Sequence, residues 1–187
     1  PRALRHNNIR DQLKTILQNF NYHVLKEPSG WCSQLSRNEG GDLAIYNISG
    51  DGKWTIVDVA VITQQEHNRT PQTSRDMAKH KESAKNCKYL TAHSAAGYNF
   101  FPLVFDQHAN LTSVGQRLVH DLARGIDYSS TTWSSLTAKA HLTQALAVVH
   151  ANANAAYLQP FLQRHTNPRL NRFTHPQLVL PQNHPTT

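Results

Sequence analysis

Two apolar runs separated by a strong turn signal constrain the fold of this chain most. Residues 42–47 and 53–62 have the composition of strands, and Ser49-Gly-Asp-Gly52 stands between them. Gly and Asp in such a segment favour a tight turn, so we expect the runs to pair as a hairpin. Asp42 opens the first run and Asp58 lies inside the second. An acid in a buried strand is costly unless it is paired or metal-bound, which makes both residues candidates for a site.

The remaining pattern predicts an α/β fold, with a mixed sheet of about four strands and helices on both faces. We expect helices over 4–19, 74–91, 112–124 and 131–158, and further strands over 22–26 and 99–105. Ser74 is expected to cap its helix, and Pro160 to end the last one. The first three strands can form a meander, and the 74–91 helix is then a right-handed crossover to the fourth strand.

The length of 187 residues suits one domain, perhaps with an appendage. We expect a core over 1–125, a helical extension over 126–163 and a basic, mobile tail over 164–187. The chain begins with Pro1 rather than Met, which predicts a segment of a longer polypeptide. The sequence shows no signal peptide and no apolar run long enough for a membrane span, and we expect free thiols, so an intracellular location is predicted.

The charge distribution suggests a polyanion as partner. The net charge is +7, yet residues 41–73 carry four acids and only two basic residues. A basic surface around an acidic pocket fits a nucleic acid held over a metal site. A generic basic surface is the alternative.

A stripe of lysines follows the two acids. Lys81, Lys85 and Lys88 fall on one side of the 74–91 helix, and Tyr89 ends the stripe. A lysine delivered from this helix could stabilise the charge that develops on a phosphate. The alternative is a solvated face whose lysine stems lie along the surface.

The two aspartates could share a magnesium ion, which takes one or two carboxylates and keeps several waters. Asp58 should share its sheet face with Ile56 and Ala60, because side chains alternate along a strand. In the alternative interpretation Asp42 only caps the end of a loop and Asp58 pairs with an arginine.

Together, Asp42, Asp58 and Lys85-Asn-Cys-Lys88-Tyr89 resemble the restriction-like endonuclease domain of non-long-terminal-repeat retrotransposons, a branch of the PD-(D/E)xK nuclease superfamily. Arg5-His6-Asn7 and Pro102-Leu-Val-Phe105 are similar as well. Gly41 replaces the proline that the family has before its first aspartate, and Ala60 replaces the superfamily's usual lysine. The displaced lysine of the retroelement branch accounts for the second difference.

The resemblance implies a restriction-endonuclease-like core with an extra C-terminal helix, and a magnesium-dependent DNA endonuclease, with manganese as a substitute metal. Asp42 and Asp58 would bind the metal, and Lys85 is the first choice for the catalytic lysine, assisted by Lys88. The DNA contacts would come from Lys81, Tyr89 and the tail arginines, which are Arg164, Arg169 and Arg172.

In this interpretation the domain nicks target DNA in the nucleus to prime reverse transcription during integration of the element. A reverse transcriptase and other domains would lie on the same polyprotein, and no membrane partner is expected. Three alternatives remain open: an inactive nucleic-acid-binding module of the same fold, a repair or junction-cleaving nuclease, and a purely structural domain.

Overall fold

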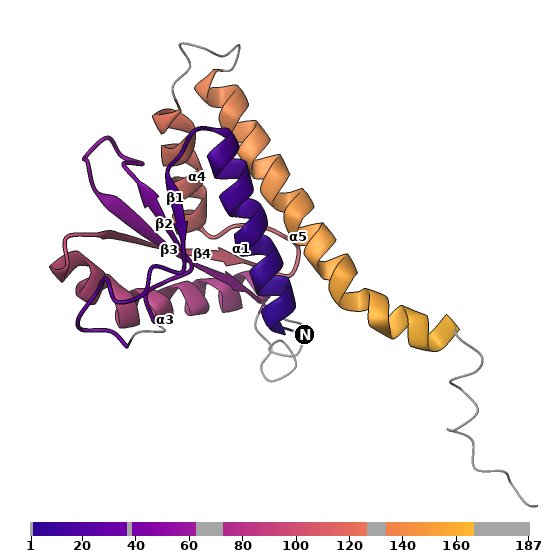
Figure 1. Cartoon of the computed structure of the whole chain (residues 1–187). Coiled ribbons are helices and arrows are strands. Elements are labelled where there is room, and N and C mark those ends of the chain that lie inside the picture. Colours follow the sequence, from indigo (N-terminus) through magenta and orange to yellow (C-terminus); the bar gives the residue numbers. More distant parts are fainter. Residues whose placement is uncertain (1, 37–38, 63–72, 127–133, 167–187) are drawn as a thin grey trace, which may run out of the picture.

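The structure is a computed structural model, shown in Figure 1, and it describes residues 2–36, 39–62, 73–126 and 134–166. The first helix, α1 (Arg2–Asn19), precedes a meander of β1 (Val24–Lys26), β2 (Leu43–Tyr46) and β3 (Trp54–Val61). Then come α3 (Ser74–Ala95), β4 (Asn99–Phe105), α4 (Ser113–Gly125) and α5 (Ser135–Thr166). The predicted α/β fold class is confirmed.

The described strands form one mixed sheet in the order β1-β2-β3-β4. The pairs β1/β2 and β2/β3 are antiparallel, and β3/β4 is parallel with α3 as the crossover. Leu43 of β2 lies opposite Val57 of β3. Asp42 directly precedes this pair, and its amide donates to the Val57 carbonyl at 2.9 Å, which places Asp42 beside the segment of β3 that holds Asp58.

Helices cover both faces of the sheet (Figure 1), with α1, α4 and α5 on one face and α3 on the other. The main core lies on the first face, where alternate strand residues such as Leu43, Val57 and Phe105 meet the three helices. On the α3 face, Ile56 and Ala60 are buried, so Asp58 shares their side as predicted.

The last helix is part of the main core. Its buried apolar residues, Ala138, Leu142, Leu146, Val149 and Ala153, pack in the same cluster as α1 and α4. Beyond this contact its C-terminal end extends away from the sheet (Figure 1).

Two sequence predictions about helix ends are wrong. Pro160 does not end α5, which runs to Thr166. Proline has a φ near −65°, which suits a helix, so its cost is a lost hydrogen bond and local crowding rather than a forbidden backbone. The N-cap of α3 is Thr73, whose side chain accepts a hydrogen bond from the Asp76 amide. Ser74 is instead the first helical residue, and its Oγ accepts from the Gln107 amide.

Gly41 explains the absence of proline before Asp42. Its φ is +94°, which proline cannot adopt, and a Cβ at this position would lie 2.4 Å from Cγ2 of Ile56. The bend at Gly41 therefore brings Asp42 onto β3 in a way that only glycine permits.

We expect Gly41→Ala to destabilise the fold more than Gly50→Ala, as measured by denaturant unfolding. Both glycines have positive φ, which costs an alanine about 1–2 kcal/mol, but a Cβ at Gly50 meets nothing within 4 Å. The collision with Ile56 should add about 1–3 kcal/mol at Gly41. Equal losses for the two variants would contradict this account of Gly41.

Candidate metal and nucleic-acid site

Asp42 and Asp58 form a close pair of carboxyl groups on the α3 face of the sheet. Each side chain is only 14% exposed. Both groups line the same cavity, and each shifts the pKa of the other: Asp58 lowers the pKa of Asp42, and Asp42 raises the pKa of Asp58. The two acids come together as the sequence predicts, although Asp42 lies directly before β2 rather than within it.

Asp42 is held by two donors. The Val59 amide donates to its Oδ2 at 2.6 Å, and Nε2 of His6 in α1 lies 2.8 Å from its Oδ1. Burial alone would raise the pKa of Asp42, but the hydrogen bonds and charge of these neighbours outweigh burial and lower that pKa. These neighbours therefore favour the ionised form of Asp42.

Asp58 is held by Lys85, whose Nζ contacts its Oδ2. Burial raises the pKa of Asp58, and the nearby Asp42 charge adds to that rise, whereas Lys85 opposes it. Lys85 is 17% exposed, so this ion pair lies largely out of water. Asp58 thus pairs with a lysine, whereas the alternative interpretation of the sequence assumed that it pairs with an arginine.

The result is a cluster with two acids and two basic groups. His6 from α1 neutralises one carboxylate, and Lys85 from α3 neutralises the other. Two neighbouring buried carboxylates cannot both stay ionised without compensation. The basic groups are therefore what allow the two acids to share a site. A divalent cation would carry the same compensating charge.

Lys88 and Tyr89 lie beside this cluster. Lys88 pairs with Glu39, which raises the pKa of Lys88, and its Nζ lies 4.9 Å from the centre of the Tyr89 ring. A cavity of about 90 Å³ is lined by Glu39, Gly41, Asp42, Asp58, Tyr89 and Phe100. It therefore opens directly onto both acids.

The other predicted nucleic-acid contacts are more distant or lie outside the described part. Lys81 is half-buried on α3 and does not line the cavity. Arg164 is in α5, but its side chain is outside the described residues, as are Arg169 and Arg172 altogether.

Sequence reasoning missed His6 and Glu39 as members of the site. His6 could have been found, because it lies three residues before Ile9 on the buried stripe of α1, where a polar side chain is unexpected. Glu39 lies in the long connection between β1 and β2, and no local pattern marks it.

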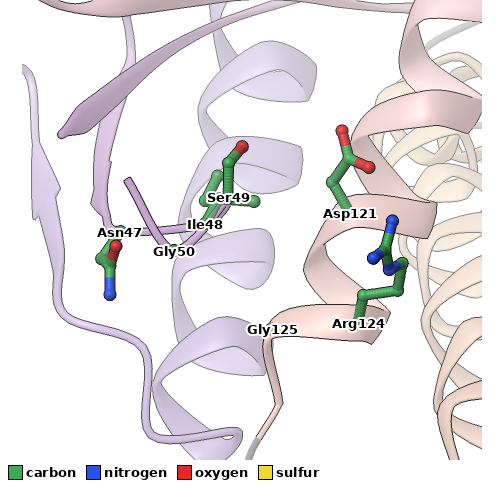
Figure 2. A pocket seen from close by; sticks show the side chains of 7 residues that line it. All are labelled: Asn47, Ile48, Ser49, Gly50, Asp121, Arg124 and Gly125. Carbon is green, nitrogen blue, oxygen red and sulfur yellow. The ribbon is translucent and has the colours of Figure 1, made fainter. Parts of the chain in front are cut away.

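A larger hollow of about 320 Å³ lies elsewhere, between the β2–β3 turn and the end of α4 (Figure 2). Asp121 and Arg124 face it from α4, opposite Ser49 of the turn. It has one carboxylate rather than a pair and contains none of the predicted site residues.

Comparison with known proteins adds no assignment. Neither a scan against models of known protein families nor a search of curated proteins gives a match for this chain.

The described residues contain no group of three or more His, Cys, Asp or Glu side chains arranged to hold a metal ion. Within that same part of the chain, no helix is both long and apolar enough to cross a bilayer.

We expect His6→Gln to reduce the metal-free melting temperature at pH below about 6.5, with the difference from the unmodified protein shrinking as pH rises. Contact with Asp42 raises the pKa of His6. Protonated His6 therefore stabilises the fold fully below its unfolded pKa, and this contribution is lost as pH rises through the folded pKa.

The control is His120→Gln, because His120 is an exposed histidine on α4. Thermal melts in EDTA across the pH range would measure both variants. A His6→Gln deficit that does not change with pH would show that His6 acts by packing and not through its charge.

Proposed function

We propose that this chain is a magnesium-dependent DNA endonuclease domain that nicks target DNA during integration of a retroelement. The observation that carries the proposal is the buried Asp42–Asp58 pair, with Lys85 delivered onto it from α3. The mixed sheet with helices on both faces is compatible with the restriction-endonuclease-like core that the resemblance implies.

The donor set fits magnesium. Magnesium is commonly held by one or two carboxylates and completes its shell with water and substrate phosphates. Asp42 and Asp58 offer two carboxylates beside a cavity with room for water. The bound metal would activate a water and compensate charge on the phosphate. Manganese, which also prefers oxygen ligands, could replace it.

The protein's own residues have separate roles in this proposal. The Val59 amide and His6 orient the Asp42 carboxylate. Lys85 of α3 supplies a positive charge, and its side chain can move from Asp58 toward the phosphate undergoing cleavage. This shift would let one lysine stabilise the metal-free acid and later the transition state.

Lys88 and Tyr89 would guide the DNA backbone at the edge of the cavity. Lys88 is half-exposed and its present partner Glu39 is an acid that a phosphate can replace. Lys81 and the arginines of the C-terminal segment, Arg164, Arg169 and Arg172, would add general phosphate attraction. A nuclear location and a reverse transcriptase on the same polyprotein complete the proposal.

One observation favours an inactive DNA-binding module as the second candidate. His6 and Lys85 already compensate both acids without a metal. In a protein that had lost catalysis, this four-residue cluster would persist as a structural ion-pair network.

We expect Asp58→Asn to abolish magnesium-dependent nicking of supercoiled DNA and to remove the rise in melting temperature that magnesium gives the unmodified protein. Asparagine keeps the shape but removes the charge that a metal requires. Asp51→Asn is the control, since Asp51 is an exposed acid in the β2–β3 turn. Nicking and magnesium stabilisation that survive in Asp58→Asn would rule out the proposed metal site.

We expect Lys85→Met to slow single-turnover cleavage by about 10²–10³-fold, the loss typical of one electrostatic group in a transition state, while DNA affinity changes little. Lys79→Met is the matched control, because Lys79 is exposed on the same helix. If Lys85→Met weakens binding and leaves the single-turnover rate intact, the catalytic lysine must be sought at Lys81 or Lys88.

A further inference from the structure

A row of aromatic side chains lies at the other end of the strands that carry the acids. Tyr46 of β2 is opposite Trp54 of β3, and Trp54 lies four positions before Asp58 on the same strand. Since the residues on one face of a strand are two apart, both rings lie on the face that holds the acids. Four steps along the strand from Trp54 to Asp58 correspond to about 13 Å.

The rings form one connected group, in which Trp54 contacts three others. The Trp54 ring lies 5.2 Å from Tyr46, 5.2 Å from His23 and 5.1 Å from Trp31, measured between centroids. Trp31 in turn lies 5.5 Å from Tyr98. These five residues, His23, Trp31, Tyr46, Trp54 and Tyr98, are here named the aromatic row.

The aromatic row is accessible. Tyr46 is 42% exposed, and His23 is exposed. Trp31, Trp54 and Tyr98 are half-buried. Among the described elements, α3 packs mainly on β4 and only little on β3.

The aromatic row is also continuous with the candidate site. Trp31, Trp54 and Tyr98 pack on the same small apolar cluster as Tyr89. Tyr89 and Phe100, whose ring centres are 5.7 Å apart, both line the cavity at the acids. One apolar cluster on this sheet face, with Phe100 at its buried centre, therefore connects the rings of Trp31, Trp54 and Tyr98 to the Tyr89 side of the acid cavity.

We propose that the aromatic row binds the unpaired DNA strand next to the cleaved phosphodiester, by stacking its rings on nucleobases. Rings of this kind are sequence-tolerant partners for bases, because every base has a π-face. The proposal rests on the proposed function for the choice of DNA as the ligand.

Charge supports this occupant over a protein partner. The chain carries a net charge of +7, and exposed Lys53 directly precedes Trp54. The nearest acid in the turn, Asp51, is engaged by the Lys53 amide at 3.0 Å and by the Asn99 side chain at 3.0 Å. Aromatic rings beside a cation are the usual composition of a single-strand binding surface.

The test is binding of a short labelled single-stranded oligodeoxynucleotide in EDTA, where no cleavage occurs. We expect Tyr46→Leu to weaken this binding by about 5-fold or more, the effect of losing one stacked base. Tyr46→Phe, which keeps the ring, should bind as tightly as the unmodified protein. Leu136→Ala is the control, since Leu136 is 77% exposed on α5.

A blunt duplex is the second ligand, because its base faces are already stacked, and Tyr46→Leu should bind it normally. Equal single-strand affinity for Tyr46→Leu and the unmodified protein would overturn the proposal, as would an equal loss on duplex. Tighter binding of single-stranded RNA than of DNA would overturn the choice of ligand. Because no metal is present, these results are independent of whether the acid pair cleaves DNA.

Discussion

The rest of the structure depends on the approach of two buried carboxylates, Asp42 and Asp58, on neighbouring strands. Each would be costly in isolation, and their mutual repulsion adds to that cost. His6 of α1 compensates the charge of Asp42, and Lys85 of α3 compensates the charge of Asp58. Removing one partner of a buried ion pair costs about 3–5 kcal/mol, because the charge that remains is buried without compensation.

The fold provides this cluster through three local features. The hairpin brings Asp42, which directly precedes β2, beside Asp58 of β3, and Gly41 supplies the bend that turns Asp42 toward β3. The crossover helix α3 then lies over β3 and β4, so that Lys85 reaches Asp58. The same hairpin pairs Tyr46 with Trp54 farther along the strands, which links the site to the aromatic row.

Much of this arrangement could be predicted because it is local in the sequence. The turn at 49–52 fixes the hairpin, and a charge inside an apolar run marks Asp58. Lys85 follows from helical spacing. By contrast, Glu39 depends on the path of a long connection, and the role of Gly41 depends on a backbone angle that residue type alone does not specify. The prediction that Pro160 ends the last helix is wrong because the free-energy cost of a proline in a helix can be offset by neighbouring helix formers such as Ala156 and Leu158.

The central claim is that the two carboxylates bind one metal ion, with Lys85 as the group that the metal displaces. The most direct measurement is a crystal structure of the protein soaked in manganese, with anomalous diffraction to locate the ion. The account predicts one anomalous peak between Asp42 and Asp58, at about 2 Å from an oxygen of each, and Lys85 moved off Asp58. A crystal with no peak there, and with Lys85 still paired to Asp58, would contradict it.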